Sequence, residues 1–399
     1  MPLYWLWYYM LPGLSVGQKL KLLEFFRDTE ELYLTRDYSG IAALTSEQRK
    51  ALQDKNLRPA QRVLQNCVRR HIGILTFSDA GYPRRLRNID EPPLVLFYKG
   101  VLPDFETRPV IGVVGTRKAS AYGLSQTRRL AQQITACGGV VVSGGAVGVD
   151  TLALQGALEA GGQPVVILGC GVDVVYPKNN KRLFAQIEEK GCILSEFLPG
   201  TEPRPWQFPQ RNRIISGVSN GVLVTEAPAR SGALITASEA LRQGRDVFAI
   251  PSNIDVPTGA GSNALLRDGA GAVFSGWDIL REYAGQYPDT VSQQQPVLRT
   301  LNSREVVEEK VADTRHLPLY SDKKDVDNPG INAYSVLDDA QKQVTPEERQ
   351  LLELLGQEPC PVDLLIQKLD MPAAQVQRIL TKLSLKGVVK NHPGGMISL

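Results

Sequence analysis

Histidine and closely spaced cysteine are scarce in this chain of 399 residues. Three histidines are present, and none of them lies in a motif that predicts a metal site or acid–base catalysis. The five cysteines are far apart and include no C-x-x-C pair, so the sequence predicts neither a disulfide framework nor a zinc site. We therefore expect a protein of the reducing cytoplasm that needs no metal.

Long apolar runs and a strong excess of one charge are also missing. The apolar opening segment, residues 1–13, is too short to span a bilayer and lacks the basic start and cleavage site of a signal peptide. We expect it to form part of a helix. The 45 basic and 42 acidic residues leave a net charge of +3, which excludes a polybasic nucleic-acid binder. Any nucleic-acid site must come from local clustering of charge.

Two common nucleotide-binding signatures are absent. No G-x-x-x-x-G-K-[ST] occurs, which argues against a P-loop ATPase. Residues 112–117 read G-V-V-G-T-R rather than G-x-G-x-x-G, and Gly144 and Gly145 stand where an acidic residue would bind the ribose of NAD. We therefore expect no cofactor.

Changes in composition along the chain divide it into four regions. Residues 1–75 have a helical pattern, and residues 76–285 alternate β-branched runs with amphipathic stretches. Residues 286–344 are polar and aperiodic, which predicts a disordered linker, and order returns over residues 345–399. The alternation in the second region, with strands apolar on both faces, predicts an α/β fold with a Rossmann-like, doubly wound, mostly parallel sheet.

The expected elements of the sheet region follow one another closely. The predicted strands are 110–114, 140–143, 165–169, 192–197, 222–225, 247–250 and 272–274. The predicted helices are 122–136, 152–160, 180–190, 234–242 and 263–267. In the N-terminal region, one helix is expected to begin near Ser15 and another helical stretch to cover residues 46–69.

The C-terminal region begins with a strong helix start. Thr345 is an N-cap candidate, followed by Pro346 and two glutamates. Helices over 361–369 and 372–386 and a hairpin of strands 388–390 and 396–398 are expected next, and three helices before a hairpin predict a winged helix. The third helix carries basic residues that either contact nucleic acid or only solvate the helix. These residues are Arg378, Lys382 and Lys386.

Glycine and basic residues gather in the loops that follow the predicted strands. Ligands of open α/β sheets bind beyond the carboxyl ends of the strands. Glycines there let backbone N–H groups converge on an anion, and the following helices add positive dipole ends. The pattern predicts a site for a row of phosphates, unless the glycines only form turns and the charges only face solvent. The candidate residues are Gly115, Thr116, Arg117, Gly144, Gly145, Ala146, Gly148, Lys178, Asn180, Arg211, Arg213, Arg230, Ser231 and Gly232.

Three more residues bear on this site. Asp150 is expected as the N-cap of the helix after the second loop, which leaves the amides of residues 144–148 for an anion. Tyr176 and Phe208 border the basic loops. Their rings either stack on bases or belong to the core.

Six ordered blocks of the sequence resemble the DNA-processing protein A family, also called Smf. They are I-G-V-V-G-T-R-K-A-S-A-Y-G, S-G-G-A-V-G-V-D, Y-P-K-N-N, F-P-Q-R-N-R-I-I-S, A-R-S-G-A-L-I-T-A and G-S-N-A-L-L-R-D-G, within residues 82–274. The resemblance implies a Rossmann-like core that binds single-stranded DNA, forms homodimers and loads the RecA recombinase during natural transformation. The family's anion-binding loops map onto residues already among the candidates: Gly115, Arg117, Gly144, Gly145, Lys178, Arg211 and Arg213.

The regions on either side of the core also resemble domains of this family. The N-terminal helices are similar to the family's sterile-alpha-motif or helix-hairpin-helix domain, and the C-terminal region to its winged helix. The leading hypothesis is a cytoplasmic recombination mediator without catalytic activity. An enzyme that cleaves nucleotide N-glycosidic bonds would use Glu226 and Glu239, but residues 228–239 only loosely match P-G-G-x-G-T-x-x-E. Without a histidine or a metal as partner, these carboxylates are better interpreted as a helix-capping group and a surface or ion-paired group. A nucleotide sensor is the third alternative.

Overall fold

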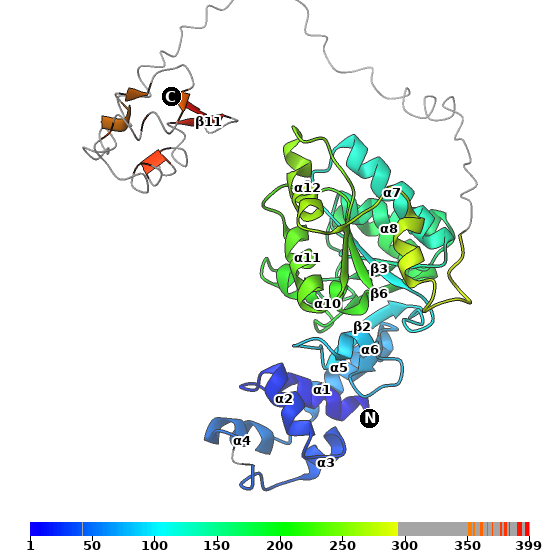
Figure 1. Ribbon diagram of the computed structural model, residues 1–399. Coiled ribbons are helices and arrows are strands. Elements are labelled where there is room, and N and C mark those ends of the chain that lie inside the picture. Colours follow the sequence, from blue (N-terminus) through cyan, green and yellow to red (C-terminus); the bar gives the residue numbers. More distant parts are fainter. Residues whose placement is uncertain are drawn as a thin grey trace, which may run out of the picture. The chain divides into compact units, whose positions relative to one another are not determined.

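The computed structural model describes residues 1–41, residues 43–293 and scattered positions between 350 and 398 (Figure 1). Its contacts divide the chain into two units, Met1–Arg299 and Thr300–Leu399. Among the described residues, no helix is long and apolar enough to cross a membrane.

The larger unit is built on one sheet with the strand order β1-β2-β6-β5-β4-β3-β7-β8-β9. All neighbours from β6 to β9 are parallel, and β2 pairs antiparallel with both β6 and β1. The doubly wound, mostly parallel sheet is therefore confirmed. The strands are β1 Gly73–Thr76, β2 Val95–Gly100, β3 Val110–Val114, β4 Val140–Ser143, β5 Val165–Ile167, β6 Cys192–Ser195, β7 Gly221–Val224, β8 Asp246–Ala249 and β9 Gly271–Ala272.

The path of the chain through this sheet creates a crevice. Strands β3 to β6 follow one another outward on one side of β3, and the chain then returns to place β7 on the other side of β3. The loops that leave β3 and β7 therefore turn to opposite sides of the sheet. Such a topological switch point is where open α/β sheets bind ligands.

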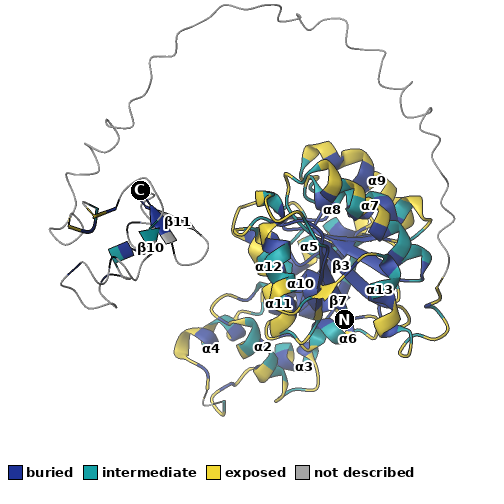
Figure 2. Cartoon of the chain, turned by 45° about the horizontal axis from the view of Figure 1, so that its top comes forward, coloured by how far each residue is buried: buried dark blue, intermediate teal, exposed yellow. Residues whose placement is uncertain are grey.

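Helices cover both faces of the sheet, and adjacent strand residues alternate between them. Ile111 and Val113 of β3 pack with α7 and α8, whereas Val110 and Val114 pack with α10 and α11. Figure 2 shows the buried strands enclosed by helices whose outer surfaces are exposed. The helices of this region are α6 Arg84–Arg87, α7 Ala121–Ala136, α8 Val149–Glu159, α9 Lys181–Lys190, α10 Gln207–Val218, α11 Gly232–Arg242, α12 Ala260–Arg267 and α13 Gly276–Leu280.

The N-terminal helices share a core with the sheet. Trp5 and Leu6 of α1 belong to one buried cluster with Phe97 of β2 and Val166 of β5. The hydroxyl of Tyr9 donates to the main-chain oxygen of Glu196 at 2.9 Å. The domain boundary expected at residue 75 stays a prediction. The helices are α1 Pro2–Met10, α2 Val16–Leu23, α3 Thr29–Leu34, α4 Ser46–Gln53 and α5 Arg58–Arg69.

Several predicted elements need correction. The stretch 46–69 is two helices, because the chain leaves the helical conformation at Asp54 and resumes it after Leu57. Strands β1 and β2 lie before the first predicted strand. The basic segment 208–213 is part of helix α10 rather than a loop. Its proline is the third helical residue, where the missing N–H breaks no intrahelical bond.

The smaller unit contains a three-stranded antiparallel sheet in the order β10-β12-β11. The strands are β10 Cys360–Pro361, β11 Lys390–His392 and β12 Met396–Ser398. The predicted hairpin is present as β11 and β12, but the helix expected from residue 361 does not begin there, since Pro361 pairs with Met396. The apolar positions Val376, Leu380 and Leu383 are buried and helical, as a winged helix requires. The start at 345–348 and the basic residues of the third helix lie outside the described residues.

Replacing Leu6 by alanine tests whether α1 and the sheet share a core. The Leu6 side chain is fully buried, so the substitution should lower the free energy of unfolding by about 2–5 kcal/mol. Because α1 packs with Phe97, backbone amides of both α1 and β2 should exchange hydrogen faster. Leu34→Ala, at a side chain that is 65% exposed, should change neither quantity. Faster exchange confined to α1 would contradict the shared core.

Candidate functional site

A cleft of about 700 Å³ lies at the switch point of the sheet. It is lined by the loop after β3, the first half of α10, and the loop after β7 with the start of α11. A smaller hollow of about 60 Å³ shares Arg117, Tyr176, Phe208 and Arg211 with it and reaches Gly144. The predicted loops after β3, β4 and β7 are thus brought to one place.

Positive charge prevails in the cleft. Arg117, Lys118, Arg211 and Arg230 line it, against one carboxylate, that of Asp150. The side chains of Arg117, Lys118 and Arg230 are exposed, and within the described ranges none of the three forms an ion pair. Cations that no protein carboxylate neutralises attract an anionic ligand.

Gly115 allows the loop after β3 to reach the end of β7. A Cβ atom at this position would lie 2.5 Å from Cγ2 of Val149 and 2.8 Å from the main-chain oxygen of Glu226. The amide of Thr116 donates to that same oxygen at 2.7 Å. The residue therefore sets the position of Arg117, which follows two residues later.

The loop after β4 binds a carboxylate of its own chain. Helix α8 has Gly148 as its N-cap, so the prediction that Asp150 is the N-cap was wrong. Asp150 is the second residue of α8, and its Oδ2 accepts from the amide of Ala146 at 3.2 Å. That amide is engaged and does not face an external anion. Gly145 and Gly148 have positive φ, and neither lines the cleft.

Arg211 is a buried anchor at the base of the cleft. Its Nη1 donates to the main-chain oxygen of Gly144 at 2.7 Å and also to that of Ile167. Burial lowers the pKa of Arg211 to about 10. Burial raises the pKa of Asp150, and the nearby Arg211 charge opposes that rise. The two groups stabilise each other's charge and join α10 to the carboxyl ends of β4 and β5.

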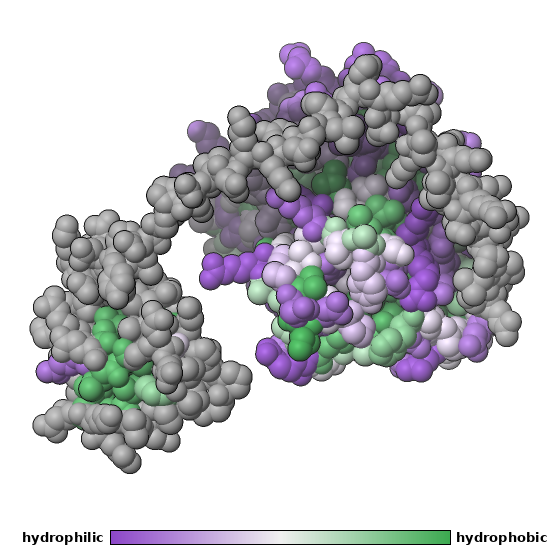
Figure 3. All heavy atoms as spheres, turned by 90° about the horizontal axis from the view of Figure 1, so that it is seen from above, coloured by the Kyte–Doolittle hydropathy of each residue, from purple (hydrophilic) through white to green (hydrophobic). Residues whose placement is uncertain are grey.

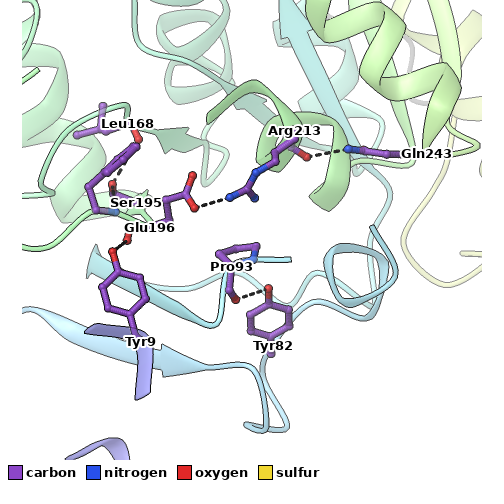
Figure 4. A network of polar contacts seen from close by, with 9 residues as sticks. Tyr9, Tyr82, Pro93, Leu168, Ser195, Glu196, Arg213 and Gln243 are labelled. Carbon is purple, nitrogen blue, oxygen red and sulfur yellow. Dashed lines mark hydrogen bonds and ion pairs between the residues drawn. The ribbon is translucent and has the colours of Figure 1, made fainter. Parts of the chain in front are cut away.

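Arg213 does not reach the cleft. Residues two apart on a helix point about 200° from each other, so Arg211 and Arg213 cannot share one side of α10. Arg213 instead forms a buried ion pair with Glu196, and its main-chain oxygen accepts from Gln243 Nε2 at 3.1 Å (Figure 4). Figure 4 also shows the hydroxyl of Tyr9, from α1, bound to the main-chain oxygen of Glu196.

The remaining candidates divide into ligand-facing and supporting residues. Lys178 is exposed at the start of the 3₁₀ turn Lys178–Asn180 but does not line the larger cleft. Asn180 is buried, and its Nδ2 donates to the main-chain oxygen of Gly145 at 3.0 Å. Ser231 is the N-cap of α11, and it lines the cleft together with the exposed Gly232.

Two aromatic rings border the cations. The ring centroids of Tyr176 and Phe208 are 5.6 Å apart, and the Arg117 guanidinium lies 5.8 Å from the Phe208 centroid. Tyr176 is 41% exposed and Phe208 is partly buried, so neither belongs fully to the core. Arg117 and the two rings form a platform on which an aromatic ligand could stack.

Both carboxylates considered for catalysis have structural partners. The buried Glu226 accepts hydrogen bonds from the amide and hydroxyl of Ser120 at 2.9 and 3.0 Å, and another from the hydroxyl of Thr258. It thereby holds Ser120, the N-cap of α7, in place. Glu239 forms an ion pair with Arg242. The ion pair of Glu239 is as predicted, whereas the N-cap of α7 is Ser120 and Glu226 supports that residue instead of capping the helix itself.

Replacing Arg211 by methionine tests its anchoring role. The change leaves Asp150 buried without its compensating charge, which should cost about 3–5 kcal/mol at neutral pH. Burial raises the pKa of Asp150, which means that the fold disfavours the ionised carboxylate. The ionised form therefore destabilises the fold at pH values above that pKa, and protonation at lower pH removes this cost. The loss should therefore be smaller at acidic pH than at neutral pH, as measured by urea unfolding.

Asp150→Asn provides the control in the Arg211→Met background. It removes the uncompensated charge and should restore part of the stability at neutral pH. An equal loss at both pH values, with no recovery in the double variant, would contradict the electrostatic pairing.

Parts of both units resemble known proteins. The sequence model of the family described as DNA recombination-mediator protein A matches residues 73–284, and that of the DprA winged helix domain matches residues 337–395. The chain is similar to the Smf protein of Synechocystis, with 34% identity over 86% of this chain and 83% of the relative. It is 38% identical to the DNA processing protein DprA of Streptococcus pneumoniae over 68% of this chain and 94% of that protein. A crystal structure of the S. pneumoniae protein covers 71% of this chain and 98% of its own length, with a TM-score of 0.63 and 36% identity.

Proposed function

Because the chain belongs to the DNA recombination-mediator protein A family, we propose that its cleft binds single-stranded DNA and that the protein delivers this DNA to a recombinase. The observation that carries the proposal is the placement of exposed Arg117 and Arg230 beside the Tyr176–Phe208 ring pair. Cations that follow a backbone, next to rings that stack on bases, are what proteins use to hold single strands. Paired bases in a duplex offer no free faces to such rings.

A polymer fits this cleft better than a single nucleotide. The exposed cations come from loops on both sides of the switch point, so they suit several phosphates in a row rather than one. Glu226, the carboxylate at the end of β7, is buried against Ser120 and Thr258 and does not present itself to a ribose. We also propose that the protein has no catalytic activity, since both candidate carboxylates are engaged.

The family description supports the wider role. A recombination mediator places a recombinase on single-stranded DNA, and we propose RecA as that recombinase, a homodimer as the working form, and natural transformation in the cytoplasm as the setting. Loading is tested by the assembly of RecA filaments on DNA that is already covered by a single-strand binding protein. Assembly should be accelerated by this protein and not by its Arg117→Ala variant.

The salt dependence of binding tests the phosphate contacts. Each contact with single-stranded DNA should add about −0.7 to the slope of log K against log salt concentration. Arg117→Ala or Arg230→Ala should therefore make the slope shallower by about 0.7 and weaken binding with little dependence on base sequence. Arg267→Ala removes an exposed charge outside the cleft and should leave the slope unchanged. Slopes for both cleft variants that overlay the wild type would refute the proposed contacts.

The aromatic platform has its own test. Phe208→Ala should weaken binding of an oligonucleotide by about 1–3 kcal/mol, because one base loses its stacking partner. Phe208→Tyr keeps the ring and should keep the affinity. An abasic oligonucleotide should bind both variants and the wild type alike, since it has no bases to stack. Competition by a mononucleotide at the concentration of the oligonucleotide would instead favour a nucleotide sensor.

A further inference from the structure

Helix α5 carries a row of arginines that the cleft does not explain. Arg58, Arg62 and Arg69 are exposed, and at four and seven residues apart they fall within about 40° of one another around the helix. The buried residues Ala60 and Cys67 lie on the opposite side of the helix. The row is about 16 Å long, at a rise of about 1.5 Å per residue.

Solvation of the helix does not account for this arrangement. Helix α5 contains no acidic residue, and in the part of the chain that the structure describes none of the three arginines forms an ion pair. Arg58 and Arg62 are like charges at the spacing where they repel, and Arg58 lies at the helix N-terminus, where the helix dipole disfavours a cation. A face that only contacted water would gain from acidic residues at these positions. An anionic partner would offset the repulsion between Arg58 and Arg62 and the unfavourable interaction of Arg58 with the helix dipole.

The row is connected to the cleft through the loop after β5. Arg70, at the end of α5, forms an ion pair with Asp173. Asp173 is five residues before Lys178, so at about 3.6 Å per residue the two lie within about 18 Å of each other, and the end of α5 lies one side-chain contact beyond Asp173. Figure 1 shows α5 next to β2 at the edge of the sheet.

Further exposed cations occupy the interval. Lys178 lies in the 3₁₀ turn before α9, and Lys181 and Arg182 begin that helix. None of the three has an ion-pair partner within the described ranges. Helices α5 and α9 contribute to one core cluster, so they cover the same face of the sheet. The space-filling view in Figure 3 shows hydrophilic groups interleaved with apolar ones on one face of the larger unit.

We propose that the arginine row of α5 is a second contact surface for the DNA backbone, which takes the strand after it leaves the cleft past Lys178. The inference rests on the proposed function of the cleft. It assigns to the N-terminal helices a direct part in DNA binding, through phosphates alone, since no exposed ring accompanies the arginines on α5. The surface should therefore add affinity only for strands long enough to extend beyond the cleft.

The test uses the full chain with Arg58→Gln, Arg62→Gln and Arg69→Gln combined, and oligothymidylates from about 5 to about 40 nucleotides. For the shortest strands, affinity and salt slope should equal those of the wild type. For the longest strands, affinity should fall and the slope should become shallower by about 2, which is three contacts at about 0.7 each. Equal affinities of the variant and the wild type at every length would overturn the proposal, as would an equal loss at every length.

A matched control removes the same charge elsewhere. Arg108→Gln, Lys190→Gln and Arg267→Gln replace exposed residues that precede β3, β6 and β9, at the opposite edge of the sheet. This variant should bind strands of every length with the wild-type slope. A triple change to lysine on α5 keeps the charge and should keep the gain in affinity with length. If the lysine variant no longer binds longer strands more tightly, the claim that this surface contacts phosphates alone would be wrong.

Thermal unfolding shows whether the glutamine variant is folded, and Arg117→Ala tests the cleft separately from α5. The thermal midpoint of the glutamine variant should equal or exceed that of the wild type, because the substitution relieves repulsion within α5. If Arg117→Ala fails to weaken the shortest strands, the proposed cleft is wrong. The α5 surface is tested independently by the difference between long and short strands.

Discussion

The buried guanidinium of Arg211 is the interaction on which the cleft depends. It joins α10 to the main-chain oxygens at the ends of β4 and β5, and it faces Asp150 of α8. Four elements that are distant in sequence thus meet at one charged group. A neutral side chain could not donate to these oxygens and compensate the carboxylate at once. The loops above can present exposed cations because this group fixes the frame beneath them.

A second buried pair fixes the other side of α10. Arg213 and Glu196 are both buried, and the main-chain oxygen of Glu196 accepts from Tyr9 of α1. Helix α10 is therefore held at the cleft by Arg211 and near the N-terminal helices by Arg213. Burial raises the pKa of Glu196, and the attraction of Arg213 opposes that rise. Breaking either member would leave a buried charge without its partner.

The cations of the larger unit fall into two classes with different tasks. The buried arginines hold the protein together and have little surface left for a ligand. Arg117, Lys118 and Arg230 are exposed and form no ion pair in the described part of the chain. Such side chains attract a negatively charged ligand. The same reasoning extends to the arginine row of α5, which is the basis for assigning it to the DNA backbone.

The sequence by itself determined the class of fold and the place of the site. Apolar runs alternating with amphipathic stretches are enough to predict a parallel sheet, and the predicted strands from β3 to β9 differ from the observed ends by at most two residues. Glycine at position 115 and the cations in the loops are properties of residue type and order. They are enough to indicate the carboxyl edge of the sheet as the place where an anion would bind.

Only the tertiary structure decided which of the basic residues face the cleft. Arg211 and Arg213 look equivalent in a segment interpreted as a loop, but on α10 they point to opposite sides. The sequence assigned Asp150 to a helix cap, because it could not show that α8 begins at Val149 and that Arg211 would lie nearby. Local pattern records periodicity along the chain. The side of a helix that meets a charge from another element depends on how the elements pack, and that is decided by the whole core.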